Sequence, residues 1–293
     1  MQTLSARIRK GDFMVACGVS DTLSAKIVEE AGFDLIWLGS LLGTASALGA
    51  TDIGLMTPTE RINQVLKIRS VSSLPVIVDG EEGWGDAPHV AYWVREFARA
   101  GAAGIMFDDK EGDFATPYVS GTSREIEPIE VATRKIRAAA DARPSSDFLI
   151  VARSAARRKY GMEEQLKRLA AYKKAGADIL WATSSHPDML KQYRKALKGP
   201  LWTTCNVNSG EQHKLRLADF KRLGIQIVGY ETAIYLVALQ ATIKAAKRLR
   251  KTGTIAPLKK DMLPFDEFIR LAGFKEMAET ARKYGVVSES ADS

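Results

Sequence analysis

The chain has 293 residues, 46% of them hydrophobic, and a formal net charge of +7. This length suffices to bury the core of one large α/β domain or two small ones. A transmembrane helix is not expected, because no run of about 18 apolar residues occurs. The first ten residues lack the long apolar stretch of a signal peptide. We therefore expect a cytoplasmic protein without a membrane partner.

The excess positive charge is spread along predicted helices, as in residues 134–137 and 244–251. No RNA-binding signature accompanies it, so we interpret these residues as solvated helix faces and expect no nucleic-acid partner. The two cysteines, Cys17 and Cys205, form no Cys-x-x-Cys motif. They predict buried, reduced thiols rather than a disulfide framework.

Short apolar runs alternate with amphipathic stretches along the chain. Eight runs predict strands, at residues 14–19, 35–39, 75–79, 104–107, 148–152, 178–183, 201–205 and 226–230. Three intervening segments end in a Gly-containing phrase just before a strand, at residues 30–34, 99–103 and 174–178, where Gly suits a left-handed helix end. This order predicts an α/β fold, a (β/α)₈ (TIM) barrel. A doubly wound open sheet is the alternative, because periodicity alone does not prove closure.

Two helical segments are predicted after the eighth strand. Residues 232–251 predict a long helix, which a stretch with Gly and Pro ends. Residues 265–284 predict a further helix with acidic residues near its N-terminus. We accordingly divide the chain into a barrel catalytic domain, 1–251, and a linker with a C-terminal helical segment, 252–293.

Acidic residues follow the third and fourth strands, where a (β/α)₈ barrel carries its chemistry. Asp79 and Glu81, as residues i and i+2, point to the same side of a strand, and Asp108 follows the next strand. Carboxylates are hard ligands that suit Mg²⁺ or Mn²⁺, so we expect a metal site on these three residues. The alternative is a loop whose acids only cap helices, a role that we assign to Asp86, which precedes an Ala-Pro pair.

Cationic and small residues follow two other strands. Arg153 ends the fifth strand, where its planar guanidinium could bind a carboxylate or phosphonate, or could pair with a neighbouring acid. Arg157 and Arg158 either widen this anion site or face solvent. Residues 39–41 follow the second strand, and their backbone N–H groups suit a carboxylate or oxyanion, although a plain loop would look the same.

Several phrases together resemble the phosphoenolpyruvate mutase and isocitrate lyase superfamily. They lie, in the expected order, at residues 15–34, 48–52, 79–85, 107–110 and 150–153. The resemblance implies a (β/α)₈ barrel whose last helix, 265–284, swaps onto a neighbouring subunit. It therefore implies a homodimer or a homotetramer.

The resemblance also implies the chemistry. The substrate would be a small anionic α-keto or 2-hydroxy acid, and Mg²⁺, held mostly through waters, would stabilise an enolate. The carboxylate and carbonyl end of the substrate would be held by Gly39, Ser40 and Leu41. Arg153 would bind the departing anion, and Asp52 would lie close to the transferring group. The implied catalytic residues are Asp52, Lys110 and Arg153.

The pair Asp109-Lys110 and residues 161–164 resemble the phosphonopyruvate mutase and hydrolase branch. This favours an enzyme that rearranges or cleaves the C–P bond of a phosphonopyruvate-like acid. The Lys-Lys-Cys-Gly-His signature of the lyases is absent.

The sequence also departs from the family pattern. Glu81 stands where Asp is usual, Asp108 where Glu is usual, and Ala155 where Glu is usual. The loop at 111–118 lacks the Lys and Asn of the mutase gating loop. Two alternatives therefore stay open: a C–C lyase or decarboxylase acting on an oxaloacetate- or 2-methylisocitrate-like acid, and a catalytically silent relative that binds a metabolite.

Overall fold

The structure is a computed structural model that describes residues 2–112, 125–183, 186–206 and 210–287. The chain forms two compact units, Met1–Tyr235 and Leu236–Ser293. The boundary between the units falls inside a long helix, α11 (Ala233–Thr252). The assignment of functional domains to residues 1–251 and 252–293 stays a prediction.

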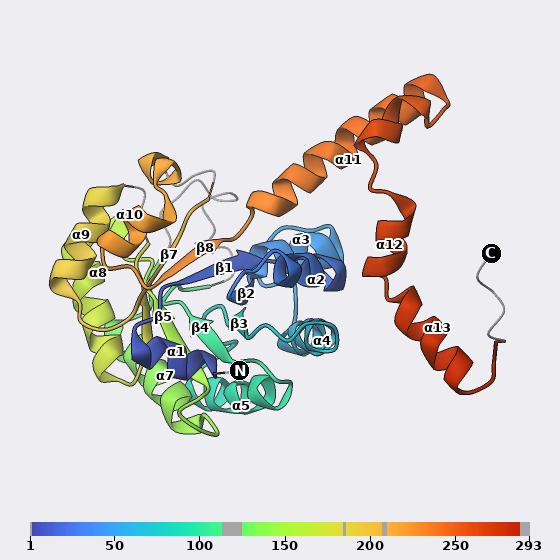
Figure 1. Cartoon of the computed structure of the whole chain (residues 1–293). Coiled ribbons are helices and arrows are strands. Elements are labelled where there is room, and N and C mark those ends of the chain that lie inside the picture. The colour runs from blue at the N-terminus through green and yellow to red at the C-terminus, as the bar shows by residue number, and fades with distance from the viewer. Residues whose placement is uncertain (1, 113–124, 184–185, 207–209, 288–293) are drawn as a thin grey trace. The chain divides into compact units, whose positions relative to one another are not determined.

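The first unit is built around eight parallel strands. They are β1 (Met14–Gly18), β2 (Leu35–Leu38), β3 (Val76–Asp79), β4 (Gly104–Phe107), β5 (Leu149–Arg153), β6 (Ile179–Trp181), β7 (Leu201–Thr204) and β8 (Ile227–Tyr230). Each strand pairs with the next, and β8 returns to β1 with Met14 opposite Ile227, which closes the barrel (Figure 1). The predicted (β/α)₈ barrel is confirmed, and the open sheet is excluded.

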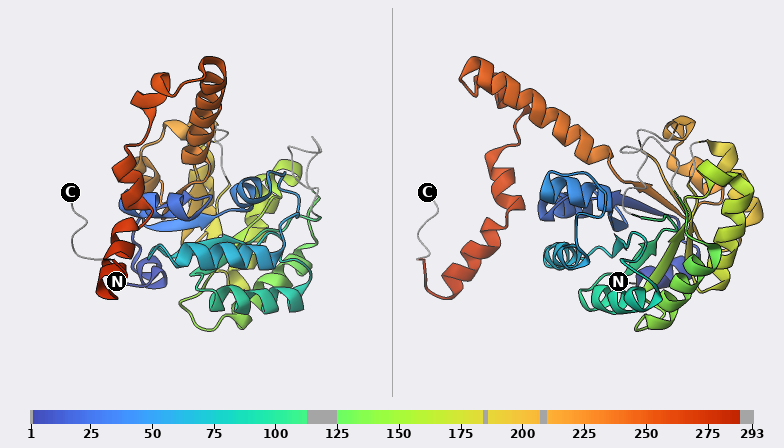
Figure 2. Two further views of the ribbon diagram at one scale, coloured as in Figure 1. Left: turned by 90° about the vertical axis from the view of Figure 1, so that its right-hand side faces the viewer. Right: turned by 180° about the vertical axis from the view of Figure 1, so that it is seen from behind.

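Helices surround these strands, as the two further views make clear (Figure 2). They are α1 (Leu4–Lys10), α2 (Thr22–Glu30), α3 (Ser40–Leu48), α4 (Pro58–Arg69), α5 (Ala87–Arg99), α7 (Ile129–Ala142), α8 (Arg157–Lys174), α9 (Pro187–Ala196) and α10 (Leu217–Arg222). The glycines that follow α2, α5 and α8 have φ values of 82°, 88° and 114°. The predicted left-handed helix ends are therefore confirmed. Asp86 caps α5 by accepting a hydrogen bond from the N–H of Ala87 (2.7 Å), as expected.

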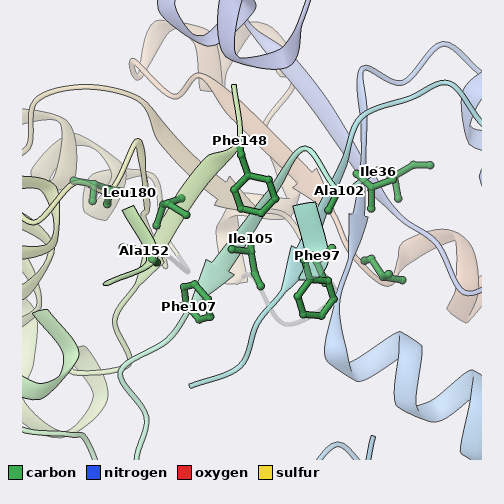
Figure 3. Packing of buried hydrophobic residues seen from close by; sticks show 14 of the residues in the cluster. Ile36, Phe97, Ala102, Ile105, Phe107, Phe148, Ala152 and Leu180 are labelled. Carbon is green, nitrogen blue, oxygen red and sulfur yellow. The ribbon is translucent and has the colours of Figure 1, made fainter. Parts of the chain in front are cut away.

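The strands divide the hydrophobic core into two layers. Trp37, Trp181 and Trp202 fill the barrel interior, with ring centroids 4.8–5.5 Å apart. Alternate strand residues, such as Ile105 and Phe107, pack outward in the layer beneath the helices (Figure 3). Because successive strand residues point to opposite faces, this pattern fixes which side chains reach the barrel axis.

The interior is covered at the N-terminal ends of the strands. Leu4 and Ile8 of α1 are buried in the interior cluster together with Met14 and Leu35, which lie at the starts of β1 and β2. The backbone carbonyl of Ile8 also accepts a hydrogen bond from the Gln226 side chain (2.8 Å). Helix α1 thus seals this end, so a ligand enters from the opposite, C-terminal mouth.

The second unit contains most of α11, a 3₁₀ turn (Ala256–Asp261), α12 (Phe265–Leu271) and α13 (Phe274–Lys283). The expectation of one helix over residues 265–284 is wrong. The chain breaks at Gly273, whose φ of 81° lies in the left-handed region, where a helix cannot continue. No residue of α11 or α13 is buried. No helix in the described part of the chain is long and apolar enough to span a membrane.

Candidate active site

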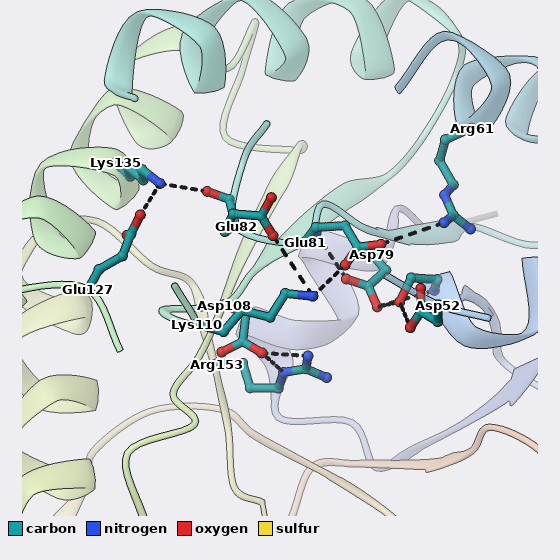
Figure 4. Close-up of polar contacts among 11 residues, drawn as sticks. Asp52, Arg61, Asp79, Glu81, Glu82, Asp108, Lys110, Glu127, Lys135 and Arg153 are labelled. Carbon is teal, nitrogen blue, oxygen red and sulfur yellow. Dashed lines mark hydrogen bonds and ion pairs between the residues drawn. The ribbon is translucent and has the colours of Figure 1, made fainter. Parts of the chain in front are cut away.

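A cavity of about 180 Å³ opens at the C-terminal mouth of the barrel. Of the nine predicted site residues, seven line it: Gly39, Ser40, Leu41, Asp52, Asp79, Lys110 and Arg153. The other two lie beside it: Asp108 lines an adjoining cavity, and Glu81, only 4% exposed, pairs with Lys110 (Figure 4). Side chains alternate between the two faces of each strand, and this explains why these residues meet at the barrel mouth. Val78 and Ala152 pack outward, so Asp79 and Arg153, which follow them, turn to the interior.

Two carboxylates share one serine at the floor of this cavity. The Asp79 carboxylate accepts hydrogen bonds from the backbone N–H (3.2 Å) and the hydroxyl (2.9 Å) of Ser40, and that hydroxyl also lies 2.9 Å from an Asp52 oxygen. Oδ1 of Asp52 is buried with no hydrogen-bond partner among the described residues. Burial and the charge of Asp79 raise the pKa of Asp52. A buried pair of carboxylates with one oxygen left without a partner suits a cation.

Glu81 lies between two buried cations. Its carboxylate is 2.6 Å from Nζ of Lys110 and 3.8 Å from Nη2 of Arg61, a residue of α4 that is 1% exposed. Burial and the charge of Asp79 raise the pKa of Glu81 to about 7, while Lys110 opposes the shift. For Lys110 itself, burial would lower the pKa, but Glu81 and the nearby aspartates outweigh it and the pKa is raised. Lys110 is therefore a charged ammonium group at the cavity wall.

The loop after β3 has an unusual backbone. Glu81 (φ 52°) and Trp84 (φ 53°) are the non-glycine residues with positive φ in the described part of the chain. Glu81 therefore does not continue the strand. The alternation of side chains along a strand does not explain why its side chain points to the same site as Asp79. The turn is fixed instead by backbone bonds from Gly80 to Met106 (2.7 Å) and from Asp108 to Glu81 (2.8 Å). Strain of this kind is common at functional sites.

Arg153 pairs with Asp108 in this structure. Nε and Nη2 of Arg153 lie 2.9 and 2.6 Å from one carboxylate oxygen of Asp108, and the guanidinium sits 5.8 Å from the Trp181 ring centroid. Burial would lower the pKa of Arg153, but Asp108 and Asp79 outweigh it and raise the pKa. The structure thus contains the ion pair with a neighbouring acid that the sequence offered as the alternative. The anion-binding role of Arg153 stays a prediction.

Asp109 serves the scaffold rather than the cavity. It accepts hydrogen bonds from the Ser154 hydroxyl (2.6 Å), the Ala155 N–H (2.7 Å) and the Tyr172 hydroxyl (2.7 Å), and it lies 3.3 Å from Arg168. These bonds tie the end of β4 to β5 and α8. Of Asp109 and Lys110, only Lys110 lines the cavity at the barrel mouth.

Three residues that sequence reasoning missed also matter. Glu231 and Thr232 line the cavity directly after β8, and the Glu231 carboxylate accepts a hydrogen bond from Asn206 (2.6 Å). An acid after a predicted strand was the signal that could have identified Glu231. Arg61 sits inside a helix, where nothing in the local sequence distinguishes it from a solvated arginine. Residues 113–118 of the expected gating loop lie outside the described residues.

In the described part of the chain, no three His, Cys, Asp or Glu side chains converge on one position as direct metal ligands. Cys17 and Cys205 are buried free thiols, as expected. A closed barrel whose C-terminal mouth gathers carboxylates, a lysine and an arginine is typical of an enzyme that acts on a small anionic molecule.

Comparisons with known proteins narrow this class. The sequence pattern of the phosphoenolpyruvate phosphomutase family matches residues 4–250, and the chain belongs to that family and is an enzyme of the phosphoenolpyruvate mutase and isocitrate lyase superfamily. The resemblance read from the sequence is confirmed. Membership of this enzyme family disfavours the catalytically silent alternative.

The chain is similar to relatives with different activities. It is 35% identical to 2,3-dimethylmalate lyase of Eubacterium barkeri over 92% of this chain and 93% of the relative. It is 33% identical to oxaloacetate decarboxylase of Pseudomonas putida, covering 80% and 79% of the two chains. The structure of phosphonopyruvate hydrolase in complex with oxalate and Mg²⁺ superposes with a TM-score of 0.86 at 29% identity, covering 96% and 97%.

Proposed function

We propose that this enzyme is a Mg²⁺-dependent lyase that cleaves a C–C bond of a 2-hydroxy or 2-keto dicarboxylic acid, such as a substituted malate or oxaloacetate. One observation carries the proposal. The cavity of about 180 Å³ adjoins a second cavity of about 220 Å³, and Arg153 and Glu231 line both. A substrate that is split into two acids needs a place for each, with a cation between them. The similarity to dimethylmalate lyase and oxaloacetate decarboxylase supports the same reaction class.

The first cavity suits the carboxylate end of the substrate. Ser40, Leu41 and Leu42 are the first residues of α3, and they line the cavity. The Ser40 N–H already donates to Asp79, but the N-cap, Gly39, makes no side-chain hydrogen bond to the N–H groups that follow. The first N–H groups of a helix have no intrahelical acceptor and carry partial positive charge, which favours an anion. We assign the substrate carboxylate to this helix end.

The residues around Ser40 fit a divalent cation. Carboxylate oxygens of Asp79 and Asp52 each lie 2.9 Å from its hydroxyl, and Asp52 keeps a buried oxygen without a partner among the described residues. Asp79, Glu81 and Asp108 would hold Mg²⁺, largely through waters because Glu81 and Asp108 are engaged by cations, and Mn²⁺ could replace it. The bound metal would polarise the substrate oxygen and stabilise an enolate.

Three side chains are assigned separate roles in the reaction. For a 2-hydroxy acid, cleavage requires that the substrate hydroxyl lose its proton as the C–C electron pair moves to the leaving acid, whose enolate then takes up a proton. For a 2-keto acid such as oxaloacetate, CO₂ leaves, the electron pair forms the pyruvate enolate, and that enolate takes up the proton. Asp52 lines the cavity and keeps a carboxylate oxygen without a hydrogen-bond partner among the described residues, so we assign it that proton. Arg153 binds the carboxylate of the leaving acid, and Lys110 balances negative charge beside Glu81.

C–P bond cleavage or rearrangement is the second candidate. The similarity to phosphonopyruvate hydrolase, with a TM-score of 0.86, favours it, as does the Asp109-Lys110 pair. The same first cavity would hold the carboxylate and carbonyl, and Arg153 would bind the phosphonate instead of a carboxylate.

A coupled assay tests the lyase reaction. Pyruvate release from 2,3-dimethylmalate and from oxaloacetate is followed by its reduction with lactate dehydrogenase. We expect turnover that requires Mg²⁺ and falls at least about 100-fold in Asp52→Asn and Asp79→Asn. Asp188→Asn, a change at an exposed carboxylate on α9, is the matched control and should leave the rate unchanged. Equal rates in the three variants would refute the assignment of the site.

We further propose that the second unit packs on a neighbouring copy of the chain. Its helices expose large apolar side chains, among them Phe265 (72% exposed), Phe268 (42%) and Met277 (69%). Exposed apolar surface of this extent is typical of an interface. A homodimer or homotetramer follows.

A further inference from the structure

The second cavity lies beside the candidate active site, over β5, β6 and β7. Besides Arg153, its wall includes Arg157 and Arg158 at the start of α8, Thr183 after β6, and Gln165. Gln165 is held in place because its side chain donates to the Ser154 carbonyl (2.6 Å) and accepts from the Tyr193 hydroxyl. That hydroxyl also bonds to the Thr183 carbonyl (2.8 Å). The wall is therefore preformed.

More positively charged than negatively charged side chains line this cavity, and the acidic ones already have partners. Its two acids are engaged: Asp108 pairs with Arg153 (2.6 Å), and Glu231 accepts from Asn206 (2.6 Å). Arg157 and Arg158 form no ion pair with any carboxylate of the described residues. The residues between β5 and these arginines are Ser154, Ala155 and Ala156, which are small and uncharged. Two guanidinium groups thus border the cavity without a matching anion.

A buried hydrogen-bond donor of Arg157 also indicates that this cavity binds an anion. Nε of Arg157 is inaccessible to solvent and has no hydrogen-bond acceptor among the described residues. Leaving a buried donor unsatisfied costs about 1–3 kcal/mol, more when the group is charged. The guanidinium lies beside the Tyr193 hydroxyl, which holds the pKa of that tyrosine below the value that burial alone would impose. A ligand anion in the cavity that Arg157 lines would give this charged guanidinium group a counterion.

We propose that the second cavity binds an additional carboxylate of the substrate and that Arg157 and Arg158 are the residues that select for it. The substrate class is then an elongated acid whose far carboxylate reaches past Arg153 to Arg157 and Arg158. This inference rests on the proposed function, because it places the reacting end of the same molecule in the first cavity. Planar guanidinium groups bind carboxylates through paired hydrogen bonds, which gives both affinity and direction.

Calorimetry with three ligands tests the inference separately from turnover. Oxalate probes the first cavity alone. The pair 2-oxoglutarate and 2-oxopentanoate share a five-carbon chain and a keto-acid end, and differ in having a carboxylate or a methyl group at the far end. With Mg²⁺ present, we expect oxalate to bind, and 2-oxoglutarate to bind about tenfold more tightly than 2-oxopentanoate.

Variants assign the effect to the arginines. In Arg157→Gln and Arg158→Gln we expect the preference for 2-oxoglutarate to fall to about twofold or less, with oxalate affinity unchanged. Lys159→Gln, which removes the next positive charge along α8, is the matched control and should keep the preference, because Lys159 pairs with Glu125 and does not line the cavity.

Each contrary result has its own meaning. Equal binding of the two five-carbon acids while oxalate binds would overturn this inference and leave the proposed function standing. Preserved preference in both arginine variants would also overturn it. Failure of all three ligands to bind would overturn the inference together with the proposed first cavity.

Discussion

The buried acid Glu81 near the candidate site lies close to side chains of opposite charge. Glu81 meets both Lys110 and Arg61, and Arg61 also donates to the Gly39 carbonyl (3.2 Å), at the start of the predicted carboxylate site. Space for Arg61 comes from Gly43, where a Cβ atom would lie 2.1 Å from Nη1. Asp79 and Arg153 could be predicted because each ends a strand, and Asp108 because it directly follows one. Arg61 could not, because its partners are distant in sequence.

Removing Arg61 should therefore destabilise the barrel. Arg61→Met keeps much of the side-chain volume but leaves Glu81 with one cation fewer, and breaking a buried ion pair costs about 3 kcal/mol. Urea unfolding followed by circular dichroism measures the free energy of unfolding. Lys67→Met, on the exposed side of the same helix, is the control and should change it little. A loss below about 1 kcal/mol in Arg61→Met would contradict the role given to Arg61.

The Cys17 thiol should be inert in the folded protein. It is fully buried, and burial raises its pKa to about 12, so almost none is thiolate at pH 8, and the thiolate is the reactive form. Mass spectrometry after iodoacetamide treatment at pH 8 should find Cys17 unlabelled in the native protein and labelled in urea. Rapid labelling of the native protein would show that the β1 region opens readily.

At the scale of single elements, the sequence predicted the start or end of a helix well where one residue forms the cap. Gly at the ends of α2, α5 and α8, and Asp86 at the start of α5, were all identifiable. The break between α12 and α13 was not predicted, because Gly273 lies within an otherwise helical pattern. The turn after β3 was also missed, since positive φ at Glu81 and Trp84 depends on bonds to the next strand.

The cap of α5 gives a prediction at this scale. Asp86 bonds to the Ala87 N–H and pairs with Arg134 of α7, so Asp86→Ala should lower the free energy of unfolding by about 1 kcal/mol. Asp86→Ser keeps a capping oxygen but not the charge, and should recover most of the loss in the same urea titration. If serine and alanine destabilise equally, the ion pair to Arg134 rather than the cap carries the effect.

At the scale of the whole molecule, the barrel could be predicted because eight strand–helix repeats constrain the topology strongly. Closure itself required the pairing of β8 with β1. The chemistry could be predicted only as a class, because relatives with the same barrel act on different acids. Discrimination among these acids depends on cavity walls assembled from separate loops, which one sequence does not reveal.

Assembly is a property of this scale. If α12 and α13 pack on a neighbouring copy, light scattering coupled to size exclusion should give the mass of a dimer or tetramer. Met277→Asp places a charge on the exposed apolar surface of α13 and should shift the protein toward the monomer. Lys275→Asp, a charge change at an exposed residue of the same helix, serves as the control. A monomeric wild-type protein would contradict the proposed packing.

The central claim is that the two adjoining cavities serve C–C cleavage. The most direct test is incubation of the purified protein with Mg²⁺ and, separately, 2,3-dimethylmalate, oxaloacetate, 2-methylisocitrate and phosphonopyruvate, followed by ¹H and ³¹P NMR. We predict that at least one of the carbon acids is split into two products while phosphonopyruvate is left intact. Release of phosphate or formation of phosphoenolpyruvate, with the carbon acids unchanged, would contradict the lyase and establish C–P chemistry instead.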